Sequence, residues 1–446
     1  MDQLAPAIRL RGAIAERTAI VGVCGLGYVG LPLAATIARA GFPVIGFDID
    51  AAKVAMLNAG GSYIGAVPEE EMARLVTAGT FRATGDFAGL ATCDVIVICV
   101  PTPLTRHREP DLSFVENTAA VIAAHLRAGQ LVVLESTTYP GTTNGVVRPI
   151  LEAVGLRSGR DFFLAFSPER EDPGNAAFRT ATIPKVVSGD GDEARGLAGL
   201  FYGSVVERVV AVSSNETAEA VKITENVFRA VNIALVNELK MVYDAMGIDI
   251  WEVIEAARTK PFGFMPFYPG PGLGGHCIPI DPFYLTWKSR EFDIPTRFIE
   301  LAGEINLAMP RYVVRRLEEA LDRRLAIALG SARILILGLA YKKNVADIRE
   351  SPSLKLMELL AARGAAVSFH DPHVAVIPPT REHAGLAGRT GLALNAGVIS
   401  AHHAVLIATD HDQVDYRLVV EHAPLVVDTR NVCRRHGLSA ASIVKA

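Results

Sequence analysis

Residues 18–30 read Thr18-Ala-Ile-Val-Gly-Val-Cys-Gly-Leu-Gly-Tyr-Val-Gly30, an apolar run that passes into a turn with three glycines. A helix-compatible run to Arg39 follows, and a second apolar run over residues 43–47 ends at Asp48, 18 residues after the third glycine. This order of strand, glycine-rich turn, helix, strand and acid is the dinucleotide-binding fingerprint. The helix N-terminus would receive the pyrophosphate. Asp48 would bind a ribose diol and repel a 2′-phosphate, so we expect NAD rather than NADP. The alternative is a tight βα turn that binds no nucleotide.

Three further apolar runs continue the rhythm of a parallel sheet: Asp94–Val100, Gln130–Leu134 and Phe162–Phe166. The polar residues that follow these runs include Thr102, Thr137, and Glu169 with Arg170. In open α/β sheets the ligand lies beyond the carboxyl ends of the strands, so we expect these side chains at the cofactor crevice. The alternative is that each threonine caps a helix or loop, and that the charges of residues 167–174 are simply solvated.

The central stretch predicts one long helix over residues 215–246, because it contains neither glycine nor proline and Gly247 follows it. Lys222 and Asn226 are four residues apart and share a helix face that continues to Asn237. A lysine and two asparagines beside apolar neighbours favour a functional face. The alternative is a lysine that extends along the helix to solvent. A helix of this length between two α/β units is also a natural dimerisation element.

A glycine-rich loop follows, and residues 269–282 read Pro269-Gly-Pro-Gly-Leu-Gly-Gly-His-Cys-Ile-Pro-Ile-Asp-Pro282. Its four glycines allow the backbone to approach a ligand closely. Asp281 before Pro282 is a strong helix-start signal. A thiol just upstream of a helix N-terminus is favoured as a thiolate, so Cys277 is a candidate covalent nucleophile. A buried structural cysteine, with Asp281 acting only as a helix cap, is the alternative.

A second α/β unit is predicted near the C-terminus, with strands over residues 332–338, 366–370, 404–408 and 424–428 and a helix over residues 353–363. Its first turn, Gly338-Leu-Ala-Tyr-Lys-Lys343, lacks the second and third glycines of a dinucleotide site. The cations expected at its strand ends are Lys342, Lys343, Arg349 and Arg430. They favour a phosphorylated ligand other than a dinucleotide.

The predicted fold class is α/β, with two Rossmann-like, doubly wound parallel-sheet domains joined by a long helix in a central helical domain. We expect an N-terminal NAD-binding domain over residues 1–212 and a C-terminal Rossmann-like domain over residues 326–446. The central domain, over residues 213–325, would carry the dimerisation helix and the cysteine loop. The chain length of 446 residues leaves room for about three domains.

Composition excludes several other classes of protein. The net charge of −4 gives no reason to expect a nucleic-acid partner. Five cysteines without paired spacing indicate neither a disulfide framework nor a metal site, and a reducing cytoplasm is the simplest setting. No apolar run reaches the ~18 residues of a membrane span, so we expect a cytoplasmic protein without a membrane partner.

Together these motifs resemble the UDP-glucose/GDP-mannose dehydrogenase family over nearly the whole chain. The segments that carry the resemblance are, in order, Gly25-Leu-Gly-Tyr-Val-Gly30, Val100-Pro-Thr-Pro103, Glu135-Ser-Thr137, Ser167-Pro-Glu-Arg170, Lys222 with Asn226, Gly274-Gly-His-Cys277 with Asp281, and Tyr341-Lys-Lys343 with Arg349-Glu-Ser-Pro352. Glucose-oxidising members usually place a lysine just before the aspartate of the cysteine motif, where this chain has Ile280. The resemblance is therefore to the N-acetylhexosamine branch.

The resemblance implies a UDP-N-acetylhexosamine substrate, with UDP-N-acetylglucosamine first and UDP-N-acetylmannosamine or UDP-glucose as alternatives. It also implies oxidation of the sugar C6 alcohol to a carboxylate with two NAD molecules, through a thiohemiacetal and a thioester on Cys277. A water held by Lys222 and Asp281 would take the hydroxyl proton. The family forms a homodimer or higher oligomer through the long helix, and Arg258 is the candidate to reach the substrate of the partner.

The site residues fall into three groups. The implied catalytic residues are Cys277, Lys222, Asn226, Asp281, Thr137 and Glu169. The expected cofactor-binding residues are Gly25, Gly27, Tyr28, Val29, Gly30, Asp48, Lys53, Thr102, Thr137 and Arg349. The implied substrate-binding residues are Glu169, Arg170, Lys222, Asn226, Arg258, Gly274, Lys342 and Arg430.

Two other function classes stay open. A two-electron dehydrogenase of the β-hydroxyacid type shares a Rossmann domain, a long helix and a lysine–asparagine pair, but it needs no thiol. A non-catalytic protein that binds NAD or a nucleotide sugar would keep the glycines, but it has no use for Cys277, Lys222 and Asp281 together.

Overall fold

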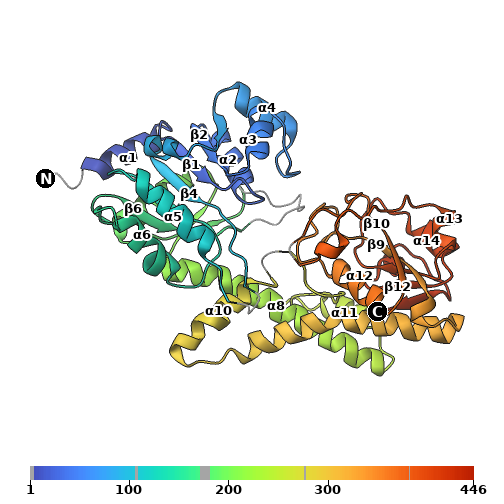
Figure 1. Cartoon of the computed structure of the whole chain (residues 1–446). Helices are drawn as coiled ribbons and strands as arrows, with labels where there is room; N and C mark the ends of the chain where they lie inside the picture. The colour runs from blue at the N-terminus through green and yellow to red at the C-terminus, as the bar shows by residue number, and fades with distance from the viewer. Residues whose placement is uncertain (1–4, 106–108, 171–180, 276–277, 381) are drawn as a thin grey trace. The chain divides into compact units, whose positions relative to one another are not determined.

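The structure is a computed structural model that describes residues 5–105, 109–170, 181–275, 278–380 and 382–446 (Figure 1). Two compact units make up the chain. The first comprises Met1–Glu225 and Phe283–Ile294, and the second comprises Asn226–Pro282 and Pro295–Ala446. The chain therefore passes from the second unit into the first immediately after the glycine-rich loop.

The first unit contains a six-stranded parallel sheet with the strand order β3-β2-β1-β4-β5-β6. Its strands are β1 (Val21–Cys24), β2 (Val44–Phe47), β3 (Phe81–Thr84), β4 (Val95–Ile98), β5 (Leu131–Leu134) and β6 (Phe163–Phe166). The order reverses at β1 and β4, which is the switch point of a doubly wound sheet. The apolar runs predicted as strands all pair here, and they are shorter than predicted by a few end residues.

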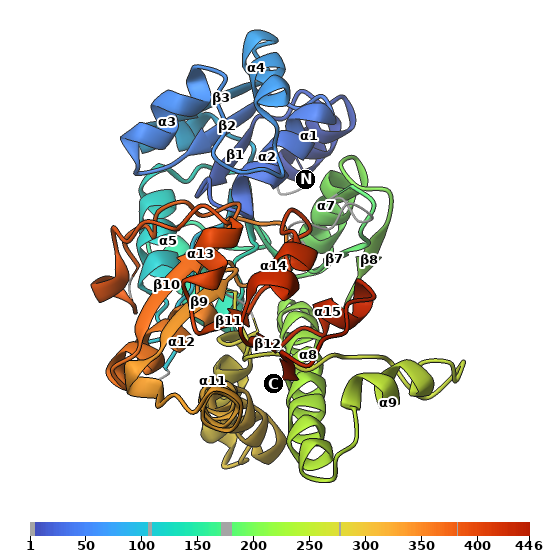
Figure 2. The ribbon, with the colours of Figure 1, turned by 90° about the vertical axis from the view of Figure 1, so that its right-hand side faces the viewer.

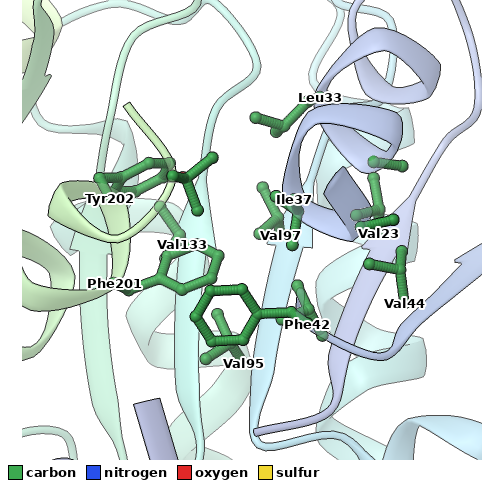
Figure 3. Close-up of a cluster of buried hydrophobic side chains, with 14 of the residues drawn as sticks. Val23, Leu33, Ile37, Phe42, Val44, Val95, Val97, Val133, Phe201 and Tyr202 are labelled. Carbon is green, nitrogen blue, oxygen red and sulfur yellow. The ribbon is translucent and has the colours of Figure 1, made fainter. Parts of the chain in front are cut away.

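Helices cover both faces of this sheet. Alternate residues of β4 point to opposite faces, so Val95 and Val97 enter one core cluster while Ile96 and Ile98 enter the other. Figure 3 shows the first cluster, in which Phe42 lies against Phe201. The helices are α1 (Ala5–Ala15), α2 (Gly30–Arg39), α3 (Ala51–Asn58), α4 (Glu69–Thr77), α5 (Ser113–His125), α6 (Arg148–Glu152) and α7 (Asp192–Gly203). A two-stranded parallel sheet, β7 (Lys185–Val187) with β8 (Val209–Ala211), completes the unit.

The second unit contains a five-stranded parallel sheet with the strand order β10-β9-β11-β12-β13. Its strands are β9 (Arg333–Leu337), β10 (Ala366–His370), β11 (Ala404–Ile407), β12 (Val426–Asp428) and β13 (Ile443–Lys445). Side chains of α11 (Arg297–Leu325) and α12 (Pro352–Ala362) pack on one face. The other face is covered by α13 (Ala396–Ser400), α14 (Tyr416–His422) and α15 (Val432–Arg435), as Figure 2 shows.

The predicted long helix is confirmed as α8, Asn215–Ala245, and Gly247 follows it with a φ of +72°. A glycine at this point adopts the left-handed conformation that ends a helix without a Cβ penalty. Two further helices surround the glycine-rich loop, α9 (Ile250–Ala257) before it and α10 (Asp281–Ser289) after it. The two Rossmann-like sheets and the central helices confirm the predicted fold class. The boundaries at residues 212 and 325 stay a prediction.

Among the helices that the structure describes, none combines the length and the apolar character that crossing a bilayer requires.

Candidate active site

The glycine-rich turn after β1 is shaped for close approach. Gly25 has a φ of +93°, and a Cβ there would lie 2.6 Å from the Cys99 carbonyl oxygen. A Cβ on Gly30 would lie 1.9 Å from the Gly25 carbonyl oxygen, so both positions require glycine for the turn to close. A Cβ on Gly27 would meet no described atom within 4 Å. The turn therefore leaves room beside its backbone, and α2 begins at Gly30, which fits a pyrophosphate at a helix N-terminus.

Asp48 lies at the carboxyl end of β2 beside this turn. It is 8% exposed, and its Oδ2 accepts a hydrogen bond from the Leu26 N–H at 2.9 Å. Its Oδ1 accepts from the Asp50 N–H at 2.9 Å. These two donors fix the carboxylate at the place where a cofactor ribose is bound in this fold. Lys53 lies nearby on α3, with its Nζ 4.0 Å from Asp50 Oδ2 and 5.7 Å from the centroid of the Tyr63 ring.

Thr102 and Thr137 follow β4 and β5, which are neighbours in the sheet, so both lie at the same sheet edge. Both are half-buried. The Ser136 hydroxyl donates to the Val100 carbonyl oxygen at 2.7 Å and so joins the two loops. Tyr284, on the part of α10 that belongs to this unit, donates its hydroxyl proton to the Thr102 carbonyl oxygen at 2.9 Å. Tyr28 lies in the glycine-rich turn, two residues before α2 begins, and is 37% exposed.

Lys222 and Glu169 form a buried ion pair. The Lys222 Nζ donates to the Glu169 backbone oxygen at 2.6 Å and to its Oε2 at 3.1 Å. The two side chains are only 7% and 8% exposed. Burying two charges costs solvation free energy that good geometry and extra hydrogen bonds must offset. The alternatives of a solvent-directed lysine and a simply solvated loop are therefore wrong for these two residues.

A second buried ion pair, which sequence reasoning missed, lies next to the first. Lys185 Nζ is 2.7 Å from Glu135 Oε2, and the Tyr202 hydroxyl donates to Glu135 Oε1. A cavity of about 20 Å³, large enough for one water molecule, borders on Glu135, Glu169 and Lys185 as well as on Val29 in the nucleotide turn. Arg170, also on its wall, pairs with Glu225 and donates to the Pro184 carbonyl oxygen at 2.7 Å.

Glu219 is a further buried acid that sequence reasoning missed. It is 0% exposed and lies three residues before Lys222 on α8. Its carboxylate accepts from the Gly141 N–H at 2.6 Å and from the Thr143 N–H and hydroxyl at 2.8 and 2.6 Å. Burial raises the pKa of Glu219 to about 7, against the opposing effect of these donors. Glu219 thus fastens the segment after Thr137 to the helix that carries Lys222.

In the second unit, Asn226 holds Asp281. Its Nδ2 donates to Asp281 Oδ2 at 2.5 Å, and the two residues are 4% and 2% exposed. The predicted helix start at this point is confirmed, since α10 begins at Asp281. Cys277 and its neighbour His276 lie outside the described residues.

The glycine-rich loop packs against two motifs of the C-terminal sheet. A Cβ on Gly274 would lie 2.5 Å from the Tyr341 Cβ and 3.0 Å from the Pro352 Cδ. The Gly275 N–H donates to the Arg349 carbonyl oxygen at 3.0 Å. The Arg349 side chain pairs with Asp347 at 2.6 Å. Motifs far apart in the sequence therefore meet at one place in the second unit.

A cavity of about 550 Å³ lies beside the start of this loop. Its charged lining residues are Arg258, Arg430, Arg434, Arg435, Glu252, Glu255 and Asp410, and its aromatic ones are Trp251 and Tyr268. Arg430 reaches it from the end of β12 and is held by a hydrogen bond from its Nε to the Ala408 carbonyl oxygen at 2.9 Å. Arg258 is half-exposed and pairs with Glu255 at 3.1 Å. Lys342 is half-buried, in the first turn of the same sheet.

Comparison with known proteins gives matches over most of the chain. Three domains of the UDP-glucose/GDP-mannose dehydrogenase family match in order: the NAD binding domain over residues 19–206, the central domain over 216–308 and the UDP binding domain over 335–435. A UDP-N-acetyl-D-glucosamine 6-dehydrogenase of Pseudomonas aeruginosa is 38% identical over 81% of this chain and 85% of its own.

A UDP-N-acetyl-D-mannosamine dehydrogenase of Pyrococcus horikoshii is 34% identical over 93% of this chain and 96% of its own. The solved structure of a UDP-D-ManNAc dehydrogenase from Pyrococcus horikoshii superposes with a TM-score of 0.85 at 33% identity, over 96% of this chain and 98% of that one. The relatives are thus named for two different sugars, N-acetylglucosamine and N-acetylmannosamine, which differ only in the configuration at C2.

Proposed function

Because the chain belongs to the UDP-glucose/GDP-mannose dehydrogenase family and uses NAD, we propose that it oxidises the C6 alcohol of a UDP-N-acetylhexosamine to the uronic acid. UDP-N-acetylglucosamine is the first candidate. The names of the similar proteins and the apolar Ile280 before Asp281 support an N-acetylated sugar. UDP-N-acetylmannosamine is the nearest alternative, because one of those relatives is named for it.

The buried polar groups of α8 carry this proposal. Lys222 and Asn226 are four residues apart on one helix face, and each holds a buried acid, Glu169 and Asp281 respectively. Burying amide, ammonium and carboxylate groups costs solvation free energy. Such groups are therefore typical of functional sites, where they act on a reacting centre. A purely structural helix face would favour apolar residues at these positions.

The proposed reaction assigns each group one task. NAD, when bound, accepts a hydride from C6 in each of the two oxidations. In the first, a water held by Lys222 and Asp281 takes the hydroxyl proton and leaves an aldehyde. The Cys277 thiolate then adds to the aldehyde carbon and forms a thiohemiacetal, so that no aldehyde escapes. The Lys222 ammonium and the Asn226 amide stabilise the negative oxygen that forms in this addition.

The second oxidation converts the thiohemiacetal into a thioester and releases a second proton. Hydrolysis then adds water, frees the thiol and yields the carboxylate. Thr137 and Glu169 are proposed to hold this water. Support for Glu169 comes from the cavity of about 20 Å³ on whose wall it lies.

The nucleotide-sugar part of the substrate is proposed to use cations of the second unit. Arg430, Lys342 and Gly274 are the proposed contacts within this chain, and Arg258 is proposed to reach the substrate of a partner copy. The cavity of about 550 Å³ supports this, because it gathers four arginines against three acids. One planar guanidinium group can donate two parallel hydrogen bonds to the oxygens of a phosphate, so a cluster of arginines suits a diphosphate.

The chain is proposed to act as a homodimer through α8. Phe228, Leu235 and Val242 are spaced by seven residues on this helix and are 47%, 52% and 46% exposed. An apolar stripe of this spacing is typical of a helix that packs against another helix. Light scattering should give twice the chain mass, and Leu235→Glu should shift it toward the monomer. An unchanged mass in that variant would argue against this face.

The substrate is tested by steady-state kinetics with a panel of UDP-sugars and NAD. A pocket built for an acetamido group should lose about 1–3 kcal/mol with UDP-glucose, or ~10- to 200-fold in kcat/KM. UDP-glucose that matches or exceeds both acetylated sugars would contradict the proposed substrate class.

A further inference from the structure

Two buried asparagines attach the start of the glycine-rich loop to α8 and α11. Asn237 is 0% exposed, and its Oδ1 accepts a hydrogen bond from the Gly270 N–H at 3.1 Å. Its Nδ2 donates to Asn306 Oδ1 at 2.9 Å. Asn306, on α11, donates its own Nδ2 to the Ala230 carbonyl oxygen at 3.0 Å. Each amide therefore has one orientation that satisfies all of these bonds, and the loop is held at a defined point.

The same helix also holds the far end of the loop, since Asn226 donates to Asp281. Asn226 and Asn237 are 11 residues apart, which is close to three helical turns and about 16 Å along one face. Gly270 precedes Cys277 by seven residues, and Asp281 follows it by four. One rigid helix face thus fixes a point on each side of the cysteine.

The loop between these points needs external anchors because it is rich in glycine. Glycine has the largest backbone freedom of any residue, so a segment that contains four of them loses much entropy when it is ordered. Gly272 has a φ of +137° and lies against Pro310 and Pro352, where a Cβ would come within 3.5 and 3.2 Å. Together with the bond from Gly275 to Arg349, these contacts give the loop further points of attachment between Gly270 and Asp281.

We propose that Asn237 is a positioning residue that, with Asn226, clamps the loop so that the Cys277 thiol meets the aldehyde. This inference rests on the proposed function. The first oxidation needs a base and a hydride acceptor but no thiol, whereas the second needs the thiol at bonding distance. A displacement of about 1 Å from reacting geometry typically costs ~100-fold in rate. Loosening the clamp should therefore impair the second oxidation and leave the first largely intact.

The test compares Asn237→Ala, Asn306→Ala and the control Asn232→Ala. Asn232 lies on the same helix but bonds to the Phe228 carbonyl oxygen of its own helix. We expect Asn237→Ala to lower the yield from two NADH per sugar toward one and to release aldehyde that hydroxylamine traps. KM for NAD should change less than ~3-fold, since the cofactor turn is untouched. Asn306→Ala keeps the bond to Gly270 and should give a smaller effect, and Asn232→Ala should behave as the parent.

A second readout does not depend on the substrate. The rate at which iodoacetamide alkylates Cys277 is followed by peptide mass spectrometry, with the buried Cys433 of the same unit as reference. We expect the alkylation rate of Cys277 to change by at least ~3-fold in Asn237→Ala and to stay at the parental value in Asn232→Ala, because local order controls access to a thiol.

The outcomes separate the two proposals. A parent chain that makes no acid from any UDP-sugar contradicts the proposed function, and the alkylation rate then decides the positioning role alone. Asn237→Ala with parental alkylation, two NADH per sugar and no trapped aldehyde overturns the inference. A circular dichroism melt confirms that each variant is folded, and Asn306→Ala supplies the comparison if Asn237→Ala is not.

Discussion

The Lys222 ammonium lies 2.6 Å from the backbone oxygen of Glu169 and 3.1 Å from its carboxylate, and the two side chains are almost wholly buried. The two residues come from elements 53 positions apart in the sequence. Their contact ties the carboxyl edge of the first sheet to the start of α8.

Lys222→Met should remove activity and destabilise the chain. The substitution keeps the side-chain volume but leaves the buried Glu169 carboxylate without this cation. Breaking a buried pair in this way costs about 3–5 kcal/mol in the free energy of unfolding, measured by urea denaturation. Lys355→Met is the matched control, because its pair with Glu358 is half-exposed and should contribute about 1 kcal/mol or less. The double variant Lys222→Met, Glu169→Gln should recover stability without activity, and a strictly additive loss would contradict the pairing.

Glu219 predicts a pH dependence of stability. Its pKa in the folded chain is raised to about 7 from an ordinary value of 4.5, so the folded state binds more protons than the unfolded state between these values. The free energy of unfolding should therefore fall as pH rises from about 4.5 to 7, by at most about 3 kcal/mol from this group. Glu219→Gln should flatten the curve in that window. An identical slope in parent and variant would show that Glu219 does not titrate there.

The cofactor turn predicts NAD over NADP by at least ~10-fold in kcat/KM, the scale of one unfavourable charge contact of about 1.4 kcal/mol. Asp48→Asn keeps an acceptor for the Leu26 N–H and removes the charge. We expect it to reduce the preference, mostly through better use of NADP. Equal rates of the parent chain with both cofactors would refute the role of Asp48.

Cys277 predicts the outcome of thiol replacement. Cys277→Ala should abolish formation of the acid, and Cys277→Ser should slow it by orders of magnitude, because a hydroxyl is a much weaker nucleophile near neutral pH. Chromatography of the products measures this directly. If the alanine variant forms acid at nearly the parental rate, Cys277 is not the nucleophile and the alternative of a structural cysteine holds.

The sequence predicted the fold well where the signals are local. The strand, glycine turn, helix and acid of residues 18–48 lie in one continuous segment. The long helix is predicted by the absence of glycine and proline from residues 215–246. The strands β3, β7, β8 and β13 were missed. Arg82 interrupts the apolar run of β3, and the other three strands have only three residues each, too few to show a period.

The candidate site was harder to predict from the sequence, because its contacts join segments that are far apart along the chain. Lys185 lies in the short strand β7, and nothing in its neighbourhood distinguishes it from a surface lysine. Glu219 is one of several acids along α8, and its partners, Gly141 and Thr143, become visible only when the loop after β5 folds against the helix. Cys277, in contrast, stands out in the sequence, although it lies outside the described residues.

The central claim is that one chain carries out both oxidations of C6 on a UDP-N-acetylhexosamine. The most direct test is to let a limiting amount of UDP-N-acetylglucosamine react to completion with excess NAD, and to quantify NADH by absorbance and the uronic acid by mass spectrometry. We predict two NADH and one uronic acid per sugar consumed. One NADH per sugar with free aldehyde as the product would contradict the account.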